Sequence, residues 1–240
     1  MELSAEKIVK NQQRLQSDRV NFDNLYQDLH NYYYVESDNV TTKKARGSEI
    51  TKLLDTTSLD AADIAAAGLS NYLTPESSKW LFLEHPNPEL RDNKEVQNWM
   101  HDTADELLYT FARSNFYNQM PIFYKSSLVY GTASLVTERD PHDNLRFYNL
   151  PINKHWLTED ARERPNAYYI QYEYTAEQAY SRFGDAVGRD VIEAYQSGAN
   201  ENKKFKYLCY IGQRNVYDPD KLDKLNIIRS LKKLTDIRRQ

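Results

Sequence analysis

The 240-residue chain has 40% hydrophobic and 28% charged residues and a formal net charge of −4. These values are typical of a globular protein with a real core, and the negative charge argues against a protein that coats nucleic acid with its whole surface. No apolar run approaches the roughly 20 residues that cross a bilayer, and the N-terminal stretch lacks the apolar segment of a secretory signal. The single cysteine, Cys209, excludes an intramolecular disulfide framework and indicates a reducing compartment.

The first predicted element is a long helix over residues 4–34. Ile8, Leu15, Phe22 and Leu29 recur at seven-residue spacing in this stretch. Such spacing is typical of a helix with one apolar stripe, which can pair with a partner helix or pack within its own chain. We favour packing within the chain, and the spacing leaves both arrangements open.

A second helix is predicted over residues 51–73, where the sequence AAAGLSNYL precedes Pro75. One side of this helix collects small and apolar residues, namely Leu54, Ala61, Ile64, Ala65, Gly68 and Tyr72. Small side chains let a neighbouring element approach closely, and such packing would offset the cost of a helical glycine, about 1 kcal/mol. We therefore expect a neighbouring element to pack closely on this face.

The stretch SKWLFLEHPNPEL predicts a short strand with Trp80 and Phe82 on one face. A capping box over residues 92–95, with Asp92 as the cap, predicts the start of the next helix. That helix carries apolar residues at helical spacing: Val96, Trp99, Met100, Thr103, Leu107, Leu108 and Phe111. A further helix is predicted over residues 116–130, where Gly131 ends it.

After Gly131 the sequence changes to short β-type segments separated by turn residues: TASLVTERD, NLRFYNL, KHWLTED and NAYYIQYEY. Thr175 and Gln178 form a capping box that opens a short helix, and Gly184 stands where its C-terminal cap is expected. Another helix over residues 189–196 leads to the strand FKYLCYIGQRNVYD.

The predicted fold class is α+β. A mainly helical region of long helices covers residues 1–130, a small mixed α+β subdomain covers residues 131–218, and a basic C-terminal tail covers residues 219–240. Within this tail, residues 229–240 hold five basic residues and one acidic residue, a local charge of +4. Its apolar residues recur every three positions and wind around a helix, which predicts a solvated or frayed end; DNA contact is the alternative.

The sequence predicts no catalytic, cofactor-binding or metal-binding residue, and so no enzyme and no cofactor. It lacks the spaced glycines of a phosphate-binding loop and the second glycine of a nucleophile elbow. His101 and Asp105 have a spacing that two metal ligands could use, but we place both on the solvated face of their helix. Cys209 alternates into an apolar strand, which favours a buried, inert thiol.

Several segments, in order and spacing, resemble the N-terminal part of the head-to-tail connector (portal) family of podovirus-type short-tailed bacteriophages. They lie within residues 26–220 and are LLDTTSLDAADIAAAGLSNYLTPESSKWLFLEHPNPEL, VQNWM, SNFYNQM, LVYGTASLVTERD, LRFYNLP, YTAEQAYSRFG and QRNVYDPD. The run from the alanine-rich helix through LTPESSKW, combined with SNFY and YGTA, is specific to this family, whereas each segment alone is weak.

The resemblance implies a structural virion protein with a portal wing-like fold. Portals of this kind are homo-oligomers that form a dodecameric ring at one capsid vertex. The terminase motor drives double-stranded DNA through the ring, the tail attaches to it later, and no membrane is involved. In such a ring the alanine-rich helix would pack on helices of its own subunit and of the neighbour, so a bulky residue at Ala65 or Gly68 should disturb this packing by roughly 1–3 kcal/mol. The resemblance also implies synthesis in the bacterial host cytoplasm.

Members of this family are much longer, and their stem, clip and crown segments follow the point where this chain stops. We therefore hypothesise a truncated, frameshifted or split portal. The alternative function is a DNA-binding adaptor that acts through the basic tail, and an enzyme ranks third.

Overall fold

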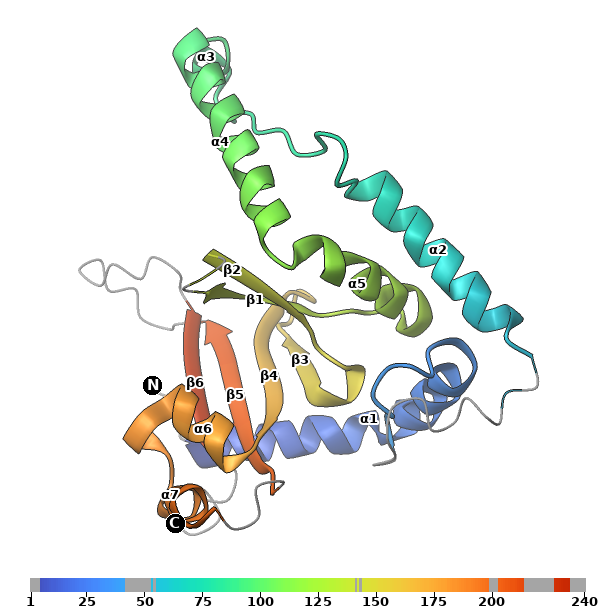
Figure 1. The fold of residues 1–240 in the computed structure, drawn as a ribbon, viewed down its shortest axis with the longest axis vertical. Helices are drawn as coiled ribbons and strands as arrows, with labels where there is room; N and C mark the ends of the chain where they lie inside the picture. The colour runs from blue at the N-terminus through green and yellow to red at the C-terminus, as the bar shows by residue number, and fades with distance from the viewer. Residues whose placement is uncertain are drawn as a thin grey trace. The chain divides into compact units, whose positions relative to one another are not determined.

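The computed structural model describes residues 5–41, 53, 55–140, 142, 144–198, 203–213 and 227–233. Contacts within the chain group it into two compact units: unit 1 is Met1–Asn21 with Lys154–Gln240, and unit 2 is Phe22–Asn153. The fold is α+β as predicted, with helices in the N-terminal part and a mixed α+β region after them (Figure 1). The division predicted at residues 130 and 218 stays a prediction.

Helix α1 (Ala5–Tyr33) confirms the predicted long helix, but its apolar stripe changes environment along its length. Ile8 is buried in a core of unit 1, and Leu29 packs against a core of unit 2. Between them, Phe22 and Leu25 are exposed. The heptad stripe is therefore not a continuous packing seam within the subunit.

Unit 1 contains a four-stranded antiparallel sheet in the order β3–β4–β5–β6. Its strands are β3 (His155–Glu159), β4 (Pro165–Tyr174), β5 (Phe205–Gln213) and β6 (Ile227–Lys233). The predicted strands over residues 154–160 and 166–174 are confirmed, and the last predicted strand is confirmed through residue 213. The aromatic and branched residues that fill these segments favour extended, half-buried backbone.

Both faces of this sheet are covered within unit 1. Leu208 and Tyr210 of β5 point to one face, where they pack with Ile8 of α1. Phe205 and Tyr207 alternate to the opposite face, where the helices α6 (Ala176–Phe183) and α7 (Arg189–Ser197) supply apolar residues. Because successive side chains of a strand point to opposite faces, β5 contributes to two cores at once.

Helix ends in the C-terminal half follow local sequence closely. Thr175 accepts a hydrogen bond from the backbone of Gln178, and the Gln178 side chain accepts one from Thr175, as the capping box predicts. Gly184 ends α6 with a positive φ of 56°, and the 3-10 helix η3 (Gly184–Ala186) follows at once. Glycine suits such positions because it lacks a Cβ.

Strand β6 overturns part of the prediction for the basic tail. Residues 227–233 pair antiparallel with β5, whereas a solvated or frayed end was expected. The expectation considered only helical periodicity, and it missed that an open edge of β5 offers backbone donors and acceptors to any extended segment. Residues 219–226 and 234–240 lie outside the described residues.

Unit 2 is built from helices and one hairpin. The helices are α2 (Thr57–Leu73), α3 (Pro88–Arg91), α4 (Lys94–Arg113) and α5 (Phe116–Tyr130); the hairpin is β1 (Leu135–Asp140) with β2 (Asn144–Asn149), and the 3-10 helix η2 (Ile152–Lys154) follows. Helix α2 lies along α5, and α5 packs on β2 (Figure 1). The core between them contains Ala66, Phe116, Met120, Tyr124 and Phe147.

The helices and both hairpin strands predicted for unit 2 are confirmed, with three corrections. Helix α2 begins at Thr57, whereas the prediction began it at residue 51, and the described residues 53, 55 and 56 are not helical. Asn93, not Asp92, caps α4, because its side chain accepts a hydrogen bond from the Glu95 backbone at 2.9 Å. The stretch around residue 80 is extended but forms no strand in the described chain. Trp80 packs against the core of unit 2, whereas Phe82 is exposed, so the two do not share one buried face.

Candidate functional site

Helix α2 has two apolar faces, and only one of them is buried. Leu59, Ala62 and Ala66 are buried. The predicted packing face, which we call the outer face of α2, is largely exposed; its described members are Ala61, Ile64, Ala65, Gly68 and Tyr72. Ile64 is 73% and Tyr72 is 89% exposed. Packing of this face on helices of its own subunit, one half of the expectation, is therefore wrong, whereas packing on a neighbouring subunit stays a prediction. Leu54 lies outside the described residues.

The error has a simple physical cause. Small and apolar residues occupy two sides of helix α2, so its periodicity does not identify which of these sides meets α5. Gly68 shows most directly that this face is not packed within the subunit, because a Cβ added there would have no heavy atom within 4 Å. Ala65 is likewise exposed. The predicted loss of 1–3 kcal/mol for bulk at these positions does not apply to the single subunit.

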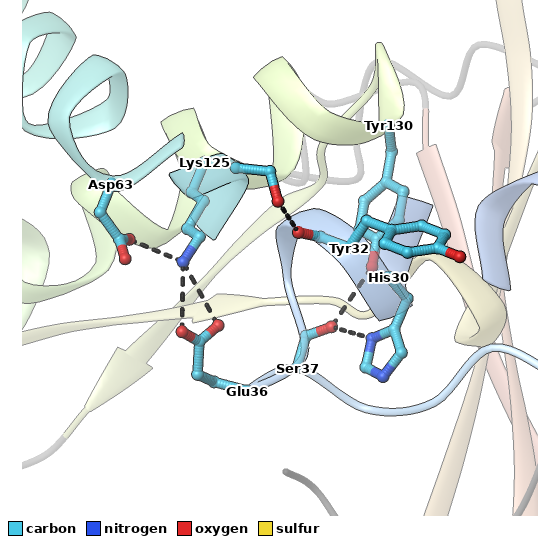
Figure 2. Close-up of polar contacts among 8 residues, drawn as sticks. His30, Tyr32, Glu36, Ser37, Asp63, Lys125 and Tyr130 are labelled. Carbon is cyan, nitrogen blue, oxygen red and sulfur yellow. Dashed lines mark hydrogen bonds and ion pairs between the residues drawn. The ribbon is translucent and has the colours of Figure 1, made fainter. Parts of the chain in front are cut away.

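A buried lysine fixes α2 against α5 from the other side. Lys125 of α5 is only 6% exposed. Its Nζ lies 2.6 Å from a carboxylate oxygen of Asp63 on α2 and 3.3 Å from one of Glu36, which follows α1 (Figure 2). The same Nζ lies 4.8 Å from the ring centroid of Tyr34. Lys125 thus joins three segments of unit 2 that are far apart in sequence.

Two acidic side chains reduce the energetic cost of burying the Lys125 ammonium group. The side chains of Glu36 and Asp63 are 51% and 55% exposed, so both carboxylates keep part of their hydration while they neutralise the ammonium group. A buried cation without such partners would be strongly destabilising. Burial also raises the pKa of Tyr34, which therefore faces the lysine as a neutral ring.

A second polar cluster lies next to Lys125 in Figure 2. His30 is fully buried, and its Nδ1 lies 3.0 Å from Ser37 Oγ. Ser37 Oγ lies 3.3 Å from the hydroxyl of Tyr130, and burial raises the pKa of Tyr130 to about 12. The Ser58 hydroxyl donates to the backbone oxygen of Tyr32 at 2.6 Å. These contacts tie the end of α1 to α2 and α5, which indicates a structural role.

Helix α4 is far less buried than α5. Of its 20 residues only Ala104 is buried, and Trp99 is 62% exposed. Residues 79–85 lie along one side of α4 and leave a shallow groove lined by Phe82, Met100 and Ala104, among others. The apolar stripe predicted for this helix is therefore only partly covered within unit 2.

The structure places His101 and Asp105 on the exposed side of α4, as predicted. Lys79 Nζ lies 2.6 Å from Asp105 Oδ1 and 3.2 Å from His101 Nδ1. The hydrogen bond from Lys79 lowers the pKa of Asp105. Across the described residues, no group of three or more His, Cys, Asp or Glu side chains could hold a metal ion. The cluster is best explained as a surface ion pair.

Three of the motifs that carry the family resemblance meet in unit 2. The Trp80 indole donates to the Tyr117 hydroxyl at 3.1 Å. The Asn115 side chain both donates to and accepts from the backbone of Phe147, each at 2.8 Å. The Asn149 side chain donates to the Gln119 backbone at 2.7 Å. Residues of LTPESSKW, SNFYNQM and LRFYNL thus hold α5 and the hairpin together.

Two further predictions concern chemistry and membranes. Cys209 is fully buried in β5, as expected for an inert thiol. Among the described residues, none of the helices combines the length and the apolar character that a bilayer crossing requires.

The comparisons with known proteins agree on one family. A sequence model of the family described as bacteriophage head to tail connecting protein matches residues 5–230. The portal protein of Salmonella phage epsilon15 is 25% identical over 203 residues, which are 83% of this chain and 36% of that protein. The probable portal protein of Bordetella phage BPP-1 is 27% identical over 176 residues, 73% of this chain and 32% of that protein.

These matches confirm the resemblance derived from the sequence motifs. They also extend it, because the family match continues through residue 230. The chain spans about a third of the length of the two curated relatives, which it covers by 36% and 32%. The DNA-binding adaptor hypothesis is not favoured, since the family match reaches into β6, which is part of a sheet.

Proposed function

We propose that this chain, which belongs to the bacteriophage head-to-tail connecting protein family, is a portal subunit or the N-terminal part of one. The family match over residues 5–230 carries the proposal, because it covers nearly the whole chain and includes both units. The names of the two relatives, a portal protein and a probable portal protein, support the same function.

In this function the chain assembles with copies of itself into a ring at one capsid vertex, dodecameric as the resemblance implies. Double-stranded DNA passes through the ring, the terminase motor docks on it during packaging, and capsid and tail proteins bind it. The chain is made in the host cytoplasm and becomes part of the virion. Its contribution is structural, and no side chain performs a reaction.

Two features of the subunit support a role in assembly. The outer face of α2 leaves Ile64 and Tyr72 exposed, and isolated subunits seldom keep such faces without a partner. The polar clusters around Lys125 and His30 join elements within unit 2, so they are explained without a substrate. Both features fit a protein whose surfaces serve contacts between chains.

Native mass spectrometry with negative-stain imaging tests the proposal. We expect purified chain to give closed rings of one stoichiometry, because heterologous contacts related by a rotation close into rings. The measurement should be repeated over a wide range of protein concentrations. A chain that stays monomeric throughout would contradict the assembly role.

A further inference from the structure

Unit 2 carries two uncovered apolar faces on different helices. One is the outer face of α2. The other lies on α4 and is formed by Val96, Trp99, Thr103 and Leu107, which we call the Trp99 flank. These four residues fall at i, i+3, i+7 and i+11, so they line one side of the helix. Trp99 is 62% exposed, and the other three are only partly buried.

Helix α4 obtains little stabilisation from burial inside unit 2, so burial of the Trp99 flank against another surface would stabilise it. A helix in a protein draws most of its stability from burial of its apolar side. In α4, only Ala104 is buried, and it lies on the side that faces residues 79–85. Val96 of the flank also lines the groove beside residues 79–85, whereas Trp99 lies on the adjoining, exposed side of the helix. This exposed side therefore resembles half of an interface.

The outer face of α2 and the Trp99 flank both consist of uncharged residues, unlike most of the protein surface. The chain is 28% charged, yet the nine residues of the outer face of α2 and the Trp99 flank include no charged side chain. The centres of protein–protein contacts are depleted of charge in the same way and enriched in aromatic residues. Trp99 and Tyr72 supply the aromatic residues, one on each face.

The two faces have complementary shapes, one flat and the other bulky. The outer face of α2 is flat between Ile64 and Tyr72, because Ala65 and Gly68 project almost nothing there. Eight residues of helix separate Ile64 from Tyr72, which is about 12 Å. The Trp99 flank is bulky instead. A large side chain that packs between two others on a flat helix lets the two helices approach closely.

We propose that the Trp99 flank of one copy packs on the outer face of α2 in the next copy. Two different faces of one chain that pair in this way make a heterologous contact, which repeats around a ring. The inference rests on the proposed function, since it names the partner as a second copy of this chain. Within one subunit α2 packs on α5 instead, so the outer face stays available.

The exposed area fits the centre of such a contact. A fully covered aromatic side chain buries about 150–250 Å², so Trp99 and Tyr72, at 62% and 89% exposure, each offer roughly 100 Å² or more. A standard interface buries about 800 Å² on each partner. The two faces therefore supply the apolar centre, and a polar rim of neighbouring surface supplies the remainder.

Charge placed on the outer face of α2 tests the proposal. Ala65→Lys puts an ammonium group into the contact, whereas Ala67→Lys puts it on an exposed position of the same helix outside the outer face. We expect Ala65→Lys to raise the concentration for half-assembly by about tenfold or more, the effect of about 1.4 kcal/mol. Ala67→Lys should assemble like the unmodified chain. Both should keep the melting temperature of the subunit, because both sites are exposed.

A mixing experiment tests the pairing itself. Trp99→Lys disables the flank and leaves the outer face of α2 intact, while Ala65→Lys does the reverse. At a protein concentration where the unmodified chain assembles but Ala65→Lys does not, neither variant should assemble alone. An equimolar mixture should give a heterodimer by native mass spectrometry, because one intact contact remains possible between the two variants. If Trp99→Lys lowers the melting temperature, Trp99→Gln serves as a second flank variant. It changes the same exposed position without adding a charge.

The outcomes separate this inference from the proposed function. If the unmodified chain and Ala65→Lys both form rings with equal ease, the assigned face is wrong while the portal function stands. Absence of heterodimers in the mixture would overturn the pairing of these two faces. A monomeric unmodified chain at every concentration would overturn both.

Discussion

The sheet of unit 1 and the helices of unit 2 differ in how completely their apolar residues are buried. In unit 1, helices cover both faces of the sheet, and Ile170 and Cys209 are fully buried. In unit 2, α2 and α4 each leave an apolar side exposed, as Ile64 and Trp99 demonstrate. The sheet completes its core within one chain, whereas α2 and α4 keep an apolar side exposed in the single chain.

An apolar pattern in this sequence can therefore mark either residues of the subunit core or residues of an exposed helix face. The β-type segment NAYYIQYEY became β4, whose Tyr169 and Ile170 are buried and stabilise the subunit. Periodicity in α2 and α4 identified apolar faces that a second copy can cover. Apolar residues thus fill cores in unit 1, whereas in unit 2 they also form exposed helix faces.

The sharpest test of this contrast compares two isoleucines. Ile170→Ala removes a fully buried side chain from the sheet and should lower the free energy of unfolding by about 2–5 kcal/mol. Ile64→Ala removes a side chain that is 73% exposed and should change it by less than about 0.5 kcal/mol. Urea denaturation of both variants below the assembly concentration measures the difference. Equal losses would show that α2 is buried in the subunit.

Lys125→Met should have the next largest effect, because it removes the cation that joins α2 to α5. The partly hydrated Glu36 and Asp63 reduce the penalty below that of a fully buried pair, so we expect a loss of about 1–2 kcal/mol. Lys79→Met is the matched control, since its partner Asp105 lies at the surface, and it should cost less than about 1 kcal/mol. A similar loss in both variants would contradict the structural role of Lys125.

Alkaline pH offers a third test within unit 2. Burial raises the pKa of Tyr130 from 10.0 to about 12, so the folded state holds its proton where the unfolded state has lost it. Stability from this group is complete below pH 10 and falls by up to about 1.4 kcal/mol per pH unit as the pH rises toward 12. Thermal unfolding of Tyr130→Phe should show a shallower decline over this range.

Tyr72→Phe provides the control for the alkaline experiment, because its side chain is 89% exposed. Its decline should match that of the unmodified chain. If Tyr130→Phe also leaves the decline unchanged, Tyr130 is not buried as described.

The smallest effect is expected at Gly68. Its Cβ position is open, and alanine is a better helix former, so Gly68→Ala should raise the free energy of unfolding by about 0.5–1 kcal/mol. Gly131→Ala is the opposite control, because Gly131 has a φ of 73° that alanine adopts with strain. A loss of stability at Gly68 would mean that another element packs against α2 within the subunit.

Local signals explain most of what could be predicted from the sequence. The capping box at Thr175 and the glycine end of α5 were predictable because neighbouring residues alone determine them. The α+β fold class followed from periodicity that changes after Gly131. The family was identifiable because its motif residues, such as Asn115, make specific contacts whose spacing is retained.

Features that depend on distant partners could not be predicted. Which face of α2 meets α5 is decided by Met120 and Tyr124, far away in sequence. Strand β6 forms because β5 offers an edge, which helical periodicity does not detect. Trp80 turns inward because Phe111 and Phe116 stack against it.

The position of Lys125 has a consequence for synthesis of the chain. Glu36 precedes it by 89 residues, so both acidic side chains and the buried side of α2 leave the ribosome long before their cation is made. Until residue 125 emerges, α2 has neither its ionic partner nor α5 to cover it. Domains fold as units during translation at about 5–20 residues per second. Unit 2 therefore cannot form this ionic contact, or cover the buried side of α2 with α5, until several seconds after Glu36 has been made.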